Sequence, residues 1–278
     1  MKCKKALGNT AQFKAHGLLE SYSVSLPQKS RQGDSLTSIY LCNLTKNLTA
    51  QSAHLNYAVL PLFTGIGLLC AFALWTILIT NVDVQAAGPE GTKVGFASFN
   101  MWFHKLCGVH MTVYNITDWL GLVPVFICIV FGVLGLCQLI KRRSLIKVDS
   151  DIILLGLYYV VVIFGYLFFE MVPINYRPIL INGFLEASYP SSTTLLILSV
   201  MPTLNFQIDR RVNNPTAKKT TKALSVIFSA FMVIGRAIAG VHWATDIIGA
   251  VLLSFGMLML YKAAASLADK RKNKNGIQ

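Results

Sequence analysis

The chain has 278 residues, of which 54% are hydrophobic and only 13% charged, and its mean hydropathy is +0.55. Soluble globular proteins carry about 25% charged residues, so this composition excludes that class and indicates a multi-spanning membrane protein. The net charge of +13 is typical of the basic cytoplasmic loops of such a protein, and we expect no nucleic-acid partner.

The two ends of the chain are polar. Residues 1–56 are rich in Ser and Thr and predict a disordered cytoplasmic tail. The basic start of this segment is not followed by an apolar core, so we expect no signal peptide. Residues 266–278 predict a second, basic cytoplasmic tail. The membrane domain is therefore expected over residues 57–265.

Apolar segments within this domain predict six membrane-spanning helices, because lipid offers the backbone no hydrogen-bond partner. The segments cover residues 57–80, 119–140, 152–172, 192–206, 223–241 and 247–265. Lys and Arg gather in the 141–151 and 207–222 loops and in the C-terminal tail, whereas the 81–118 loop has two lysines and no arginine. Basic loops are cytoplasmic. The predicted fold is an all-α integral membrane protein, a bundle of six transmembrane helices with both termini cytoplasmic.

The outer 81–118 loop contains ring-bearing and aliphatic residues at three- and four-residue spacing. This pattern is typical of a helix lying on the membrane surface, either over a site or packed on the spans without such a role. The residues are Phe96, Phe99, Phe103, Leu106, His110 and Val113.

Several polar side chains are expected to meet at the outer face although they come from separate segments. Arg177 follows the third span, and Arg236 lies near the outer end of the fifth. An arginine within an apolar helix is costly unless it reaches water, a partner or an anion. The fourth span begins with hydroxyl side chains and with the free N–H groups of a helix start, which together favour an anion. These hydroxyl residues are Ser191, Ser192 and Thr193.

A histidine and a carboxylate lie beside this anion site. His242 and Asp246 are four residues apart, so on a helical turn the carboxylate can hold one ring nitrogen and leave the other to attack or to take a proton. Two guanidinium groups and a helix start offer more hydrogen-bond donors and positive charge than one carboxylate ligand needs, so the site favours a phosphate ligand. No metal or other cofactor is implied, because the arginines supply the positive charge and no CxxC or carboxylate cluster occurs.

The stretches "NYRPIL", "YPSSTTLL" and "GRAIAGVHWATD" resemble the three motifs of the type 2 phosphatidic acid phosphatase and haloperoxidase superfamily. The usual forms of these motifs are K-x6-R-P, P-S-G-H and S-R-x5-H-x3-D. The resemblance covers roughly residues 119–265, and motif order and topology both agree.

The resemblance implies roles for the matching residues. His242 would attack phosphorus to give a phosphohistidine, and Asp246 would orient it. Arg177 and Arg236 would hold the phosphoryl oxygens, and the hydroxyl or N–H groups at 191–192 would donate to them.

The chain departs from the family pattern at several motif positions. Glu170 replaces the lysine, Thr193 replaces the histidine that protonates the leaving oxygen, Ser192 replaces a glycine, and Gly235 replaces a serine. Loss of a positioned acid costs about 10²–10⁴ in rate. Either the leaving group needs little help, as in an isoprenoid diphosphate, or another residue supplies the proton, or the site only binds. Glu170 and Glu186 are the nearest candidate donors, ahead of His104 and His110, and Glu170 has the alternative of pairing with Arg177 or Arg236.

The predicted function is a phosphohydrolase of the cell membrane that acts on a lipid phosphate or isoprenoid diphosphate at the outer leaflet. A lipid phosphotransferase is a close variant, because an alcohol can replace water as the acceptor. The competing classes are a catalytically impaired binding protein and a transporter of anionic lipid, although no internal repeat supports the transporter. The expected partner is a membrane lipid substrate, and no obligate protein partner is implied.

Overall fold

A computed structural model describes the backbone of residues 34–275 and the side chains of residues 58–269. The chain divides into two compact units, Met1–Ala53 and His54–Gln278. Residues 1–33 of the predicted N-terminal tail lie outside the described residues. Helix α1 (Asp34–Asn81) begins within the remainder of that predicted tail, where the sequence up to residue 56 contains no glycine or proline to interrupt it.

The regular elements of the described chain are helices, joined by loops that hold isolated β-bridges. The fold is therefore all-α, as predicted. The α-helices after α1 are α2 (Ala97–Cys107), α3 (Met111–Leu120), α4 (Leu122–Arg142), α5 (Ser150–Met171), α6 (Ser192–Arg211), α7 (Pro215–Ile238) and α8 (Ala244–Asn275). Two short 3-10 turns complete them, η2 (Pro89–Gly91) and η3 (Leu145–Lys147).

Five stretches of the described chain are long and apolar enough to cross a membrane. They are Ala58–Asn81, Met111–Arg142, Ser150–Met171, Pro215–Ile238 and Ala244–Asp269. Each overlaps one of the predicted spans, which confirms a multi-pass membrane protein. Helix α6, which corresponds to the predicted fourth span, is not among them because polar residues interrupt its apolar run.

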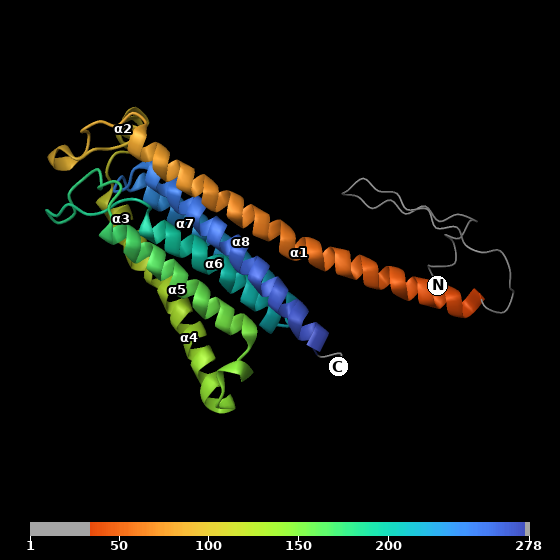
Figure 1. Cartoon of the computed structure of the whole chain (residues 1–278). Helices are drawn as coiled ribbons and strands as arrows, with labels where there is room; N and C mark the ends of the chain where they lie inside the picture. Colours follow the sequence, from red (N-terminus) through yellow and green to blue (C-terminus); the bar gives the residue numbers. More distant parts are fainter. Residues whose placement is uncertain (1–33, 276–278) are drawn as a thin grey trace. The chain divides into compact units, whose positions relative to one another are not determined.

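The polarity of α6 follows from its central position. It contacts α4, α5, α7 and α8, and Figure 1 shows α5 to α8 running side by side. Two of its buried polar side chains bond to the neighbouring helices instead of facing lipid. Gln207 donates to the hydroxyl of Tyr261 on α8 at 3.1 Å, and Thr203 shares a 2.9 Å hydrogen bond with Tyr159 on α5. Such interhelical bonds let a helix remain in a membrane bundle without an apolar surface all round.

The surface helix predicted over the 81–118 loop is interrupted. Gly108, with φ of 71°, ends α2 and separates it from α3, so the apolar residues at 96–113 do not share one helical face. Trp102 and Leu106 on α2 are exposed, whereas α3 packs against α7. Helix α3 thus belongs to the body of the membrane domain.

The turn between α7 and α8 is held against the segment that joins α2 to α3. Gly240 has φ of 68°, and a Cβ at this position would lie 2.0 Å from the carbonyl oxygen of Gly108. The N–H of His110 donates to the carbonyl of Ala239 at 3.0 Å. This close backbone contact places the start of α3 beside the turn that carries His242.

Candidate active site

His242 is buried in the turn between α7 and α8. Its Nδ1 lies 3.2 Å from the backbone oxygen of Ser188, which can only accept, so Nδ1 carries the ring proton. Nε2 then keeps its lone pair and accepts from Nη2 of Arg236 at 3.4 Å. The pKa of His242 is lowered well below its ordinary value, mainly by burial and to a smaller extent by the positive charges of Arg177 and Arg236. The ring is therefore neutral at pH 7, with Nε2 available as a nucleophile.

Asp246, on the first turn of α8, reaches His242 through Ser188. Its Oδ2 accepts from the Ser188 hydroxyl at 2.5 Å and from the backbone N–H of Trp243 at 2.8 Å. The same hydroxyl lies 3.1 Å from Nδ1 of His242, whereas Nδ1 and Oδ2 of Asp246 are 4.0 Å apart. His242 precedes the first residue of α8, so the two side chains do not share the helical turn that their spacing predicts.

The two arginines meet on the ring of Tyr114, which comes from α3. Cζ of Arg177 lies 5.7 Å from the ring centroid, and Cζ of Arg236 lies 4.9 Å from it. Both distances are in the range of cation–π contacts. Because Arg236 also contacts His242, these residues form one group, which we call the arginine cluster: Arg177, Arg236, Tyr114 and His242.

Each arginine of the cluster has one carboxylate beside it. Nε of Arg177 lies 3.1 Å from Oε2 of Glu186, and Nη1 of Arg236 lies 3.6 Å from Oδ1 of Asp118. The first N–H is not directed at its oxygen and the second pair is too long, so both contacts are charge attractions without a hydrogen bond.

Both guanidinium groups keep buried donors that no described residue satisfies. These donors are Nε and Nη1 of Arg177 and of Arg236. The Arg236 side chain is only 1% exposed. A buried cationic donor without an acceptor is destabilising, so the cluster is suited to an anion that accepts from both arginines.

The predicted hydroxyl residues lie at the start of α6. Ser191 is buried, its N–H donates to the carbonyl of Asp246 at 3.2 Å, and its hydroxyl donates to Thr194 at 3.1 Å. Thr193 lies beside the α3–α4 junction, because a Cβ on Gly121 would be 3.5 Å from its Cγ2. The start of α6 is thereby fixed to α8, and its first N–H groups have no partner within the helix.

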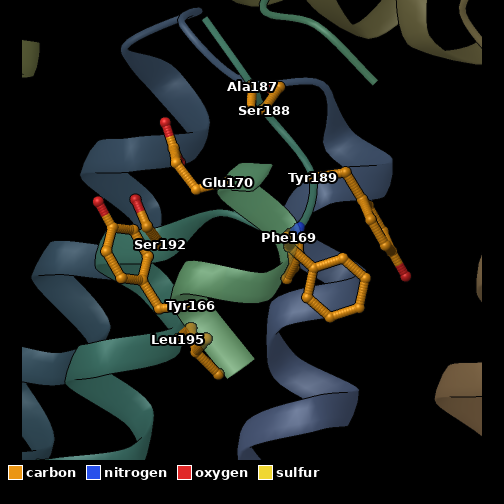
Figure 2. Close-up of a pocket in the computed structure, with 9 residues that line it drawn as sticks. Tyr166, Phe169, Glu170, Ala187, Ser188, Tyr189, Ser192 and Leu195 are labelled. Carbon is orange, nitrogen blue, oxygen red and sulfur yellow. The ribbon is translucent and has the colours of Figure 1, made fainter. Parts of the chain in front are cut away.

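Glu170 lies at the end of α5. It lines a small pocket together with Tyr166, Ser188 and Ser192, which are labelled in Figure 2. Within the described residues Glu170 forms no ion pair, and Glu186 is the residue that pairs with Arg177. The predicted alternative for Glu170, a pair with either arginine, is therefore not formed.

The two histidines of the 81–118 loop also lie outside the cluster. The His104 ring packs against Trp243 with centroids 5.6 Å apart, and burial lowers the pKa of His104. His110 is exposed, and its Nε2 lies 2.8 Å from the carbonyl oxygen of Cys107. Over residues 58–269, no group of three or more His, Cys, Asp and Glu lies close enough together to hold a metal ion.

Comparison with known proteins agrees with the three motifs. Residues 152–268 match the family model of the PAP2 superfamily, and this stretch contains every residue of the cluster except Tyr114. This part of the chain belongs to the PAP2 superfamily. No curated protein matches the chain.

The solved structures include one with the same fold. It is described as the first transmembrane PAP2 type phosphatidylglycerolphosphate phosphatase from Bacillus subtilis. The match has a TM-score of 0.53 at 16% identity, and covers 75% of this chain and 97% of that one. The likeness shows that the membrane domain has a PAP2 fold.

One departure from the PAP2 motifs has a structural explanation. A Cβ on Gly235, at the position of the family serine, would lie 2.7 Å from Cγ2 of Thr117 on α3. Thr117 is fully buried there. The glycine therefore lets α3 pack closely on α7, beside Arg236.

Sequence reasoning missed four residues around the PAP2 motifs. Ser188 and Asn175 both donate hydrogen bonds to Asp246, and the bond from Asn175 Nδ2 to Oδ1 is 3.4 Å long. Tyr114 and Asp118 contact the arginines. Tyr114 and Asp118 are one helical turn apart, a spacing that would have placed them together had this segment been predicted as a helix of the bundle.

Proposed function

We propose that the protein is a membrane phosphatase that removes phosphate from a lipid phosphate or an isoprenoid diphosphate. The observation that carries the proposal is the pair of buried arginines with unpartnered donors, one of which, Arg236, bonds to Nε2 of His242. PAP2 membership favours phosphatase activity in general. The similar protein from Bacillus subtilis is described as a phosphatidylglycerolphosphate phosphatase, which favours a lipid substrate.

In the proposed mechanism the phosphoryl oxygens accept from Arg177, Arg236 and the first N–H groups of α6. These donors neutralise the charge that develops in the transition state. Nε2 of His242 attacks phosphorus, and the resulting imidazolium is stabilised at Nδ1 by the Ser188 carbonyl. Asp246, acting through the Ser188 hydroxyl, fixes the ring tautomer. Water then cleaves the phosphohistidine.

The proposed topology has α6 as a sixth span and both termini in the cytoplasm. At the end of α6 away from Ser192, Arg210 pairs with Asp269 and Arg211 with Asp151. Basic residues mark the cytoplasmic side. The arginine cluster, at the start of α6, would then face the extracytoplasmic side of the cell membrane and the outer leaflet.

Two alternatives follow from the same site. A phosphotransferase would form the same intermediate and pass it to an alcohol. A catalytically impaired protein would bind phosphate without turnover, because Thr193 stands where the family has its acid histidine.

The test is phosphate release by the purified protein in liposomes, without added metal, from an isoprenoid diphosphate and from phosphatidic acid. We expect release from at least one substrate. Release that requires an added alcohol would favour the phosphotransferase. Binding of orthovanadate, an analogue of phosphate in its transition state, with no turnover of either lipid would contradict the phosphatase and favour the binding protein.

Tyr114 is expected to hold the arginines apart and in place for phosphate. Its ring contributes about 0.5–2 kcal/mol per guanidinium. Tyr114→Leu should therefore weaken orthovanadate binding by about tenfold, whereas Tyr114→Phe, which keeps the ring, should bind nearly as well as the wild type. Inhibition constants for the two variants measure this difference, and equal weakening by both would show that the hydroxyl, not the ring, matters.

A further inference from the structure

Helix α3 presents a row of residues to the phosphate site. Tyr114, Asp118 and Gly121 follow at intervals of four and three, which places them on one helical face. Tyr114 contacts both arginines, Asp118 contacts Arg236, and Gly121 lies against Thr193. Asp118 therefore lies between the arginine cluster and the position where the family has its acid histidine.

Helix α3 approaches α7 closely near Thr193, the residue that stands where the family has its acid histidine. Gly235 allows Thr117 to pack directly on α7, next to Arg236. One turn further along α3, the methyl of Thr193 lies beside the α3–α4 junction. Helix α3 thus lies along the side of the site that the family histidine would line.

We propose that Asp118 is the proton donor that replaces the second-motif histidine. This inference rests on the proposed phosphatase function. The Asp118 side chain is 57% exposed, so it can exchange protons with water. Its only ion-pair partner among the described residues is Arg236, at 3.6 Å and without a hydrogen bond. Bound phosphate would compete for that arginine, so the carboxyl group would lie beside the phosphate instead of pairing with the guanidinium.

The step balances in protons and bonds. Nε2 of His242 forms a bond to phosphorus, the bond from phosphorus to the ester oxygen breaks, and the Asp118 carboxyl proton passes to that oxygen to give the alcohol. Water then attacks the phosphohistidine, the P–N bond breaks, and Asp118 takes up the proton of the attacking water. The sum is hydrolysis of one phosphate ester by one water.

The two glutamates are placed less well for this role. Glu186 pairs with Arg177, which forms no hydrogen bond with Nε2 of His242 within the described chain. Glu170 lines the pocket that contains Ser188 and Ser192, and among the described residues it forms no ion pair with either arginine. Asp118 alone of the three carboxylates contacts the arginine that bonds to the nucleophile.

The experiment compares two substrates that differ only in their leaving group, farnesyl monophosphate and farnesyl diphosphate. The monophosphate expels an alkoxide and needs a proton, whereas the diphosphate expels a phosphate ester and does not. Asp118→Asn should lower turnover of the monophosphate by about 10²–10⁴ and that of the diphosphate by less than tenfold. Unchanged orthovanadate inhibition would show that the variant retains its folded site.

Glu186→Gln is the matched control, because it neutralises the other carboxylate that pairs with a cluster arginine. We expect it to affect both substrates to the same extent. Equal losses on both substrates in Asp118→Asn, or a selective loss in Glu186→Gln instead, would overturn the role of Asp118 alone. Hydrolysis of only the diphosphate by the wild type would also overturn it, since no acid would then operate. No hydrolysis of either substrate by the wild type would overturn the phosphatase function as well.

Discussion

Replacement of His242 by glutamine is expected to lower phosphate release by about 10⁴-fold or more, because the variant lacks the nucleophile. Glutamine is polar and of similar size, so it can still donate to the Ser188 carbonyl that receives Nδ1 in the wild type. The loss should therefore appear in kcat while the affinity for orthovanadate, which depends on the arginines, changes little. Quenched reactions with radiolabelled substrate should show acid-labile label on the wild type and none on the variant.

His110→Gln is the control for this measurement. His110 is exposed and bonds to the Cys107 carbonyl, outside the arginine cluster. We expect wild-type turnover and normal labelling from it. A His242→Gln variant that retained more than a tenth of the wild-type turnover would contradict the phosphohistidine mechanism and would require a direct attack by water.

The parts of the site that sequence could predict are those set by motif spacing. Arg177, Arg236 and His242 come from three segments, and each was expected at one face because apolar spans and basic loops fix where segments end. In the structure both arginines contact the aromatic ring of Tyr114, and Arg236 donates a hydrogen bond to His242. The expectation of an anion site follows equally from the cost of a buried arginine.

The parts that sequence could not predict depend on loop conformation. Ser188 occupies a position two residues before the proline of the second motif, and nothing in its spacing indicates that it bridges His242 and Asp246. The four-residue spacing instead suggested a direct contact between those two side chains. Hydrogen bonds from Ser188 and Trp243 hold the carboxylate where the ring nitrogen does not reach it.

Helix α3 was missed for a different reason. Hydropathy defined the second span from residue 119, so Tyr114 and Asp118 fell in a segment expected to lie on the membrane surface. The packing that draws α3 into the bundle depends on Gly235, which in sequence reads only as a departure from the family serine. A glycine contributes little to a hydropathy profile, although its lack of a side chain decides how closely two helices can approach.

Replacement of Arg236 by lysine is expected to weaken orthovanadate binding by about 10–100-fold and to lower kcat in addition. The substitution keeps the positive charge but removes the planar fork, and each charge-assisted hydrogen bond contributes about 1.5–3 kcal/mol. Arg236 must donate to Nε2 of His242 and to phosphate from one buried group, and a lysine ammonium has no rigid geometry that serves both. Loss of the contact with His242 should also let the ring reorient, which accounts for the expected fall in kcat.

Arg211→Lys provides the matched comparison, because Arg211 is also an ion-paired arginine but lies at the opposite end of α6, where it contacts Asp151. It should leave both orthovanadate inhibition and turnover near wild-type values. If Arg236→Lys bound orthovanadate as tightly as Arg211→Lys, the unpaired donors of Arg236 would not be phosphate ligands. Charge alone would then explain why an arginine persists in an apolar helix. If binding weakened but kcat did not fall, Arg236 would hold phosphate without positioning His242, and the 3.4 Å contact between them would have no part in the attack.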